Sequence, residues 1–299
     1  MEQVKRKRKR GDRKDAYQVK DCPALLRLLP HILPNRTDCE VYISQKIDVT
    51  KLMEYIRKKN AEHPNYKTTI FHCLVVAMAR VLKERHYMNR FIQGRRIYER
   101  FEISLSFMAK RRFADGADEA MMIVKPKDED TLDTISHRIY GDVTQMRKKE
   151  HAEDGDGIDG TIEKVMRMPT IFVMALVKIV RILDFWGKNP DVFTDGDINY
   201  TSVLFSNLGS IGCPSVYHHL NNYGTNSVVI TLGTVHKENK IMPDGSIQLR
   251  DIVDFGATID ERIGDGFYFA RSLKLVEYIC EHPEILDKPL GENSGFEYK

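Results

Sequence analysis

The hydrophobic positions of this chain follow two periods in irregular alternation, one of two residues and one of about 3.6 residues. Val41, Ile43, Ile47 and Val49 share one face of an extended strand, whereas residues 70–78 are apolar on nearly every side, as in a buried central helix. Further strands are predicted at 103–107, 121–124, 203–206, 228–235 and 246–259, and further helices at 50–59, 132–146 and 266–283. The mixture predicts a fold in which strands and helices share one core.

The stretch from Ile198 to His236 contains no Lys, Arg, Asp or Glu, although these residues make up 30% of the chain. Its many Ser, Asn and Gly residues exclude a membrane span, so it predicts strand, tight turns and strand through the middle of the domain. Because buried ionisable groups are costly, the histidines left in it, His218, His219 and His236, are candidates for chemistry.

Residues 150–198 interrupt this pattern and predict an inserted helical subdomain. The insertion opens with a polar loop in which Gly155–Gly160 match the letters GxGxxG, but a charged helix precedes them and their carboxylates would repel a phosphate. The same glycines do not fit a calcium loop, so we expect a plain connection. The apolar stretch from Met166 to Trp186 is expected to pack over a substrate channel, with a membrane surface as the alternative.

Composition and charge narrow the class of protein. With 299 residues, 42% of them hydrophobic, the chain predicts a globular protein with a sizeable core. Its five cysteines are scattered without a CxxC pair, which favours a reducing cytoplasm and disfavours zinc.

The basic charge is confined to one end. Residues 1–20 hold nine Lys or Arg and three Asp or Glu, whereas the other 37 basic and 40 acidic residues leave the body at −3. We expect residues 1–19 to be a disordered basic tail that makes at most weak contact with a membrane surface. Nucleic acid is not expected as the main partner, because the body adds no basic patch.

Three segments occur in a specific order: Ser206–Gly212 (SNLGSIG), the strand at 228–235, and 259–266 (IDERIGDG). Together with 46–52 and 88–92, they resemble the catalytic domain of the 2-oxoacid dehydrogenase acyltransferases, which is structurally akin to chloramphenicol acetyltransferase. The resemblance implies a two-layer α/β sandwich with a mixed sheet and flanking helices. It places this domain at 20–290, with the insertion at 150–198 and a tail at 291–299.

The same resemblance implies a homotrimer with its active site in a channel at the subunit interface, where coenzyme A meets a small acyl acceptor. No metal is implied. In the family a histidine is the general base and a Ser or Thr hydroxyl stabilises the oxyanion, the role that falls here to Ser206. Asp265 and Gly266 match a structural Asp-Gly pair, Arg36 is the expected ionic partner of Asp265, and Asn207 is a candidate second donor.

The chain departs from the family at the catalytic histidine, whose position is occupied by Glu261. A carboxylate is about two pKa units less basic than an imidazole, which amounts to about 3 kcal/mol or a factor of about 100 in proton abstraction. Burial beside Asp260 and Asp265 would restore part of this basicity, whereas Arg262 or Arg36 nearby would lower it further. His218 or His219 is the alternative base.

The sequence therefore leaves two functions open. The first is a stand-alone, coenzyme A-dependent acyltransferase that acts on a small thiol, hydroxyl or amine, with Glu261 and Ser206 as catalytic residues. The second is a catalytically inactive trimer of the same fold that serves as a ligand-binding or interaction scaffold. Because the match begins near residue 20, we expect no lipoyl domain ahead of it.

Overall fold

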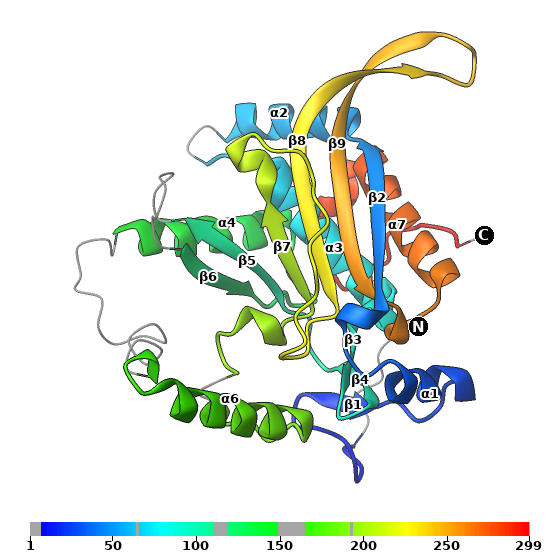
Figure 1. Cartoon of the computed structure of the whole chain (residues 1–299). Coiled ribbons are helices and arrows are strands. Elements are labelled where there is room, and N and C mark those ends of the chain that lie inside the picture. Colours follow the sequence, from blue (N-terminus) through cyan, green and yellow to red (C-terminus); the bar gives the residue numbers. More distant parts are fainter. Residues whose placement is uncertain (1–6, 64–65, 111–118, 149–164, 192–193, 299) are drawn as a thin grey trace.

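The computed structural model describes residues 7–63, 66–110, 119–148, 165–191 and 194–298. At its centre is a six-stranded mixed sheet in the order β2-β9-β8-β7-β5-β6 (Figure 1). Its strands are β2 (Glu40–Asp48), β5 (Leu105–Lys110), β6 (Glu119–Val124), β7 (Val203–Asn207), β8 (Val228–Ile241) and β9 (Ile247–Asp260). The central pairs β5–β7 and β7–β8 are parallel, and the outer pairs are antiparallel.

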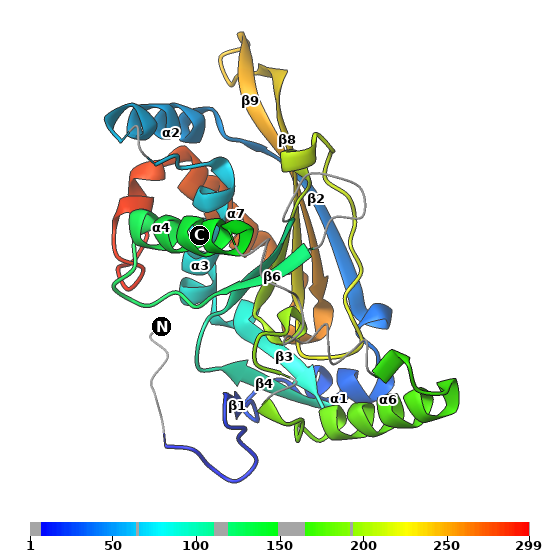
Figure 2. The same cartoon turned by 90° about the vertical axis from the view of Figure 1, so that its left-hand side faces the viewer.

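Helices cover one face of the sheet (Figure 2). These are α2 (Thr50–Glu62), α3 (Ile70–Glu84), α4 (Leu132–Lys148) and α7 (Gly266–Glu281). Helix α3 is the central one: residues 71–82 are all buried, and Thr69 caps its first turn. The predicted buried helix and the two-layer α/β sandwich are thus confirmed.

No helix layer formed by the described residues covers the opposite face of the sheet, here called the open face (Figure 2). The connection between β7 and β8 crosses it, and the hydroxyl of Thr231 on β8 holds this connection by donating to the carbonyl of Val216 at 2.6 Å. A Cβ atom at Gly256 would overlap the hydroxyls of Thr231 and Ser215, so only glycine lets the connection lie this close to the sheet. Strands β8 and β9 continue beyond the sheet as a projecting hairpin (Figure 1).

A second, three-stranded sheet was not predicted. It consists of β1 (Ala16–Gln18), β4 (Arg96–Arg100) and β3 (Arg90–Gln93), with α1 (Ala24–Ile32) beside it. The expected tail at 1–19 is therefore too long, because Ala16 is fully buried and β1 pairs with β4. Dense charges on either side of Ala16 conceal this short strand in the sequence.

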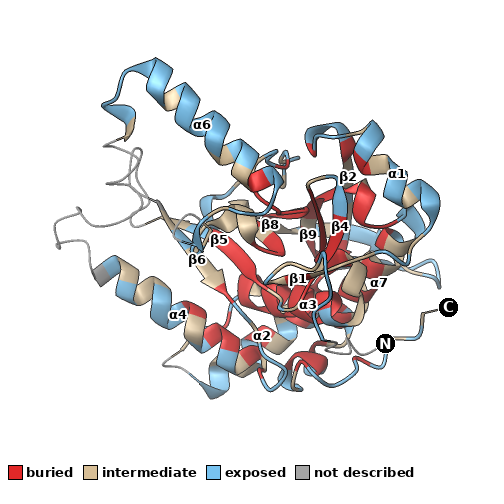
Figure 3. Cartoon of the chain, turned by 90° about the horizontal axis from the view of Figure 1, so that it is seen from below, coloured by how far each residue is buried: buried red, intermediate tan, exposed pale blue. Residues whose placement is uncertain are grey.

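The insertion contains α6 (Thr170–Phe185), which lies apart from the main sheet (Figure 3). Residues 149–164, including the expected loop at Gly155–Gly160, lie outside the described residues. Within the described part of the chain, no helix combines the length and the apolar character that a bilayer crossing needs.

Candidate functional site

Ser206 lines a cavity of about 450 Å³ at the point where β5 and β7 separate. The two strands pair only as far as Phe107 and Phe205, and the cavity lies beside the residues that follow in each strand. Helices α3 and α4 contribute its other wall, including His72 and Tyr140. The parting of two parallel strands thus produces a pocket in the middle of the sheet.

Ser206 is directed to the open face by the alternation of β7. Its neighbour Phe205 packs on Phe71 of α3, so Ser206 projects the other way, beside Thr231 in register. Asn207 also lines the cavity and ends the strand, where its carbonyl accepts a hydrogen bond from the hydroxyl of Ser210 at 2.7 Å. A serine hydroxyl and an asparagine amide, both hydrogen-bond donors, therefore line the same cavity.

His218 lines the same cavity, from the connection that crosses the open face. Its Nδ1 lies 2.7 Å from the carbonyl oxygen of His219. Because a carbonyl only accepts, Nδ1 carries the proton of this bond, and in the neutral imidazole Nε2 is then the acceptor. His219 stacks on His218 but is exposed and does not line the cavity. Of the two alternative bases, only His218 is in the same cavity as Ser206.

His72 is a cavity residue to which the sequence analysis gave no role. Its Nδ1 accepts a hydrogen bond from the backbone N–H of Thr69, and burial lowers its pKa to about 4. At neutral pH this side chain is therefore an uncharged wall of the pocket. Its place in the first turn of a buried helix, three residues after a capping threonine, was the available clue.

The pKa of His72 predicts a loss of stability in acid. Between pH 6.5 and about 4 the unfolded chain binds a proton here that the folded chain does not, so the free energy of unfolding falls as the pH drops through this window. The expected contribution is about 3 kcal/mol. Urea unfolding of wild type and His72→Gln, which retains a capping acceptor, measures it; equal pH slopes for the two proteins would show that His72 has no such effect.

Glu261 lies at the other end of the sheet. It is half-buried in a short 3-10 turn, Glu261–Ile263, directly after β9. Ser206 is level with Thr231 and Gly256, and the five residues from there to Glu261 span on the order of 17 Å of strand. The two predicted catalytic residues are not brought together within one protomer, so their meeting would require a second subunit.

The expected ion pair between Arg36 and Asp265 is wrong. The Arg36 guanidinium is buried and donates to the carbonyls of Ile92 and Asn221 at 2.6 and 3.2 Å. Asp265 is exposed and caps α7 by accepting from the backbone N–H of Tyr268 at 2.7 Å, with Gly266 next to it as the first helical residue. The Asp265 carboxylate caps α7, and the Arg36 guanidinium donates to backbone carbonyl oxygens instead.

The buried ion pair of this region is instead Asp260–Arg262. Arg262 donates to both carboxylate oxygens of Asp260 at 2.8 and 2.7 Å, and it also donates to the carbonyl of Leu33. Burial acts to lower the pKa of Arg262. The hydrogen bonds to Asp260 and the charge of Asp260 outweigh this effect, so the pKa of Arg262 lies above its ordinary value. The pair connects the end of β9 to the segment after α1.

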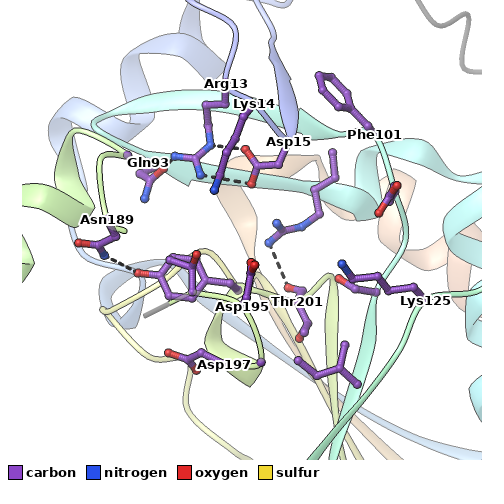
Figure 4. A pocket seen from close by; sticks show the side chains of 18 of the residues that line it. Arg13, Lys14, Asp15, Gln93, Phe101, Lys125, Asn189, Asp195, Asp197 and Thr201 are labelled. Atoms are coloured by element: carbon purple, nitrogen blue, oxygen red, sulfur yellow. Dashed lines mark hydrogen bonds and ion pairs between the residues drawn. The ribbon is translucent and has the colours of Figure 1, made fainter. Parts of the chain in front are cut away.

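A larger cavity, of about 750 Å³, lies near β1 and holds none of the predicted site residues (Figure 4). Two of its arginines are already engaged: Arg13 pairs with Asp15, and Arg100 donates to the carbonyl of Thr201. Among the described residues, no group of three His, Cys, Asp or Glu side chains is arranged to hold a metal. The Ser206 cavity is therefore the better candidate for chemistry.

No family model matches the chain. A curated relative, the lipoamide acyltransferase component of the branched-chain alpha-keto acid dehydrogenase complex of Bacillus subtilis, is 23% identical over 242 residues. The match covers 79% of this chain and 45% of that protein, so the chain spans less than half of the relative's length.

The fold of the chain is also similar to that of solved structures. Dihydrolipoamide acetyltransferase of Azotobacter vinelandii is 15% identical with a TM-score of 0.58, and 90% of this chain and 94% of that one are covered. The truncated catalytic core of the 2-oxoacid dehydrogenase complex of Thermoplasma acidophilum is 14% identical with a TM-score of 0.55, and 89% and 99% are covered. The chain has the fold of the 2-oxoacid dehydrogenase acyltransferase catalytic domain, and the resemblance predicted from the sequence is confirmed.

Proposed function

We propose that the chain is a coenzyme A-dependent acyltransferase that delivers an acyl group to a small thiol, hydroxyl or amine. The observation that carries this proposal is that Ser206 and His218 line one cavity, with Nε2 of His218 left as an acceptor. The similarity to lipoamide and dihydrolipoamide acyltransferases supports the reaction class, and one of those relatives was studied for a serine, a histidine and an asparagine in its catalytic mechanism.

The proposed chemistry needs one base and one oxyanion donor. Nε2 of His218 removes the proton of the acceptor as its sulfur, oxygen or nitrogen attacks the thioester carbonyl of acyl-coenzyme A. The hydroxyl of Ser206 donates to the oxyanion of the tetrahedral intermediate, and Asn207 is the candidate second donor. When the carbon–sulfur bond breaks, the departing thiolate of coenzyme A takes the proton back from His218, so the histidine is regenerated.

A homotrimer is part of the proposal. Large apolar side chains are exposed on the open face and on the connection that crosses it, namely Tyr42, Met108, Met121, Val216 and Tyr217. Such a patch on a sheet face is typical of a subunit interface. A neighbouring subunit placed there would close the Ser206 cavity, and Glu261 of that subunit is the competing base.

The five cysteines are free thiols, which supports a reducing compartment, and we propose the cytoplasm.

The test of function is incubation of the protein with acetyl-coenzyme A and a panel of thiols, amines and alcohols while free coenzyme A thiol is followed. We expect turnover with at least one acceptor. A folded protein that binds coenzyme A but turns over with none of them would favour the scaffold alternative.

A further inference from the structure

Helix α6 exposes an unusual amount of apolar surface. Its large apolar side chains are between 37% and 73% exposed over most of the helix circumference, at Ile171, Phe172, Met174, Leu176, Val177, Ile179, Ile182 and Phe185. Trp186, which follows the helix, is 62% exposed and is the only tryptophan of the chain. None of these residues lines the Ser206 cavity within the protomer, so packing over a substrate channel stays a prediction.

The position of α6 is fixed by its carboxyl end. Asp184 is buried, and its carboxylate accepts hydrogen bonds from Tyr200 at 2.6 Å, from Gln93 at 3.1 Å and from Asn189 at 3.3 Å. The rest of the helix projects from the body (Figure 3). The only acid of the helix is thus used as an anchor, and the apolar surface is held outward.

Helix α1 lies at the same end of the molecule (Figure 1) and is also apolar on its outer side, where Leu25, Leu28 and Ile32 are exposed. The exposed charged side chains of the two helices are basic, at Arg27, Lys178 and Arg181. Arg95 in the turn between β3 and β4 and Arg96 at the start of β4 are also exposed. In the sequence beyond residue 20 acids outnumber bases, whereas the exposed Lys, Arg, Asp and Glu side chains on these two helices are all basic.

We propose that α6 and α1 bind the surface of a bilayer that contains anionic phospholipids. Apolar side chains enter the interface while Lys178, Arg181 and the neighbouring arginines bind lipid phosphates. The basic side chains favour an anionic surface over an uncharged one. Trp186 at the helix end is the residue type enriched at membrane–water interfaces.

The experiment is co-sedimentation of the full chain with vesicles of phosphatidylcholine alone or mixed with phosphatidylglycerol. We expect binding to the mixed vesicles, lowered about tenfold or more by Phe172→Asp/Ile179→Asp and by Lys178→Gln/Arg181→Gln. The matched control is Ile241→Asp/Ile247→Asp, two residues of similar exposure on the β8–β9 hairpin, which should bind like wild type.

Two further measurements separate the outcomes. Mixed vesicles should shift the emission of Trp186 to shorter wavelength, and sedimentation velocity should give the same oligomeric state for wild type and Phe172→Asp/Ile179→Asp. Equal vesicle binding by the helix and hairpin variants, or an unchanged Trp186 spectrum, would overturn the proposal. Loss of the oligomer in the α6 variant without vesicle binding by wild type would assign the surface to a second copy instead.

Discussion

Replacing His218 by asparagine is expected to lower kcat/KM for acyl transfer by about 10²–10⁴-fold, the usual contribution of a general base. An asparagine amide retains a donor for the carbonyl of His219 but has no basic nitrogen, so the variant removes the proton acceptor while preserving the local hydrogen bond. The measurement is the initial rate of coenzyme A release with the acceptor identified from the panel, over a range of acceptor concentrations.

Glu261 supplies the control for this prediction. Glu261→Gln should leave kcat/KM within a few-fold of wild type, because Glu261 lies far from Ser206 in the protomer. Glu261→His, which introduces the residue that the sequence resemblance implies at this position, should then gain little. The opposite pattern, with Glu261→Gln inactive and His218→Asn active, would assign the base to Glu261.

Asp260→Asn is expected to destabilise the fold by about 3–5 kcal/mol, because it leaves the Arg262 guanidinium buried without a compensating charge. Both side chains are almost fully buried, at 0% and 1% exposed. The free energy of unfolding in urea, at a pH near neutrality, measures the effect.

Asp265→Asn is the matched control, five residues further along the same motif. Asp265 is exposed and serves as a helix cap, a role that asparagine performs equally well, so a change within about 0.5 kcal/mol is expected. If the two variants lose similar stability, the ion pair is not the main support of this segment.

The fold was predicted correctly where the pattern of apolar and charged residues is compatible with only one kind of element. Residues 70–78 are apolar on all sides, which only a central helix accommodates, and α3 confirms it. The charge-free stretch from Ile198 to His236 likewise crosses the middle of the sheet through β7 and β8. By contrast, β1 is three residues long within a charged segment, and no periodicity reveals so short a strand.

The site was harder to predict because sequence order does not give distance. Ser206 and His218 are twelve residues apart and share a cavity only because the connection folds back over the open face onto Thr231. The sequence resemblance predicts Glu261 at the position of the family's base, but the register of β9 places it at the opposite end of the sheet from Ser206. Nothing in the sequence around Arg36 indicated that its guanidinium would donate hydrogen bonds to backbone carbonyls.

Co-expression of Ser206→Ala chains with His218→Asn chains tests most directly whether one protomer supplies both groups. Every site in a mixed assembly would then lack either the hydroxyl or the imidazole, so coenzyme A release should stay at the level of the single variants. Wild-type chains mixed with Ser206→Ala chains provide the positive control. Recovery of a substantial fraction of wild-type activity from two inactive variants would mean that the site is shared between subunits, and would contradict the account.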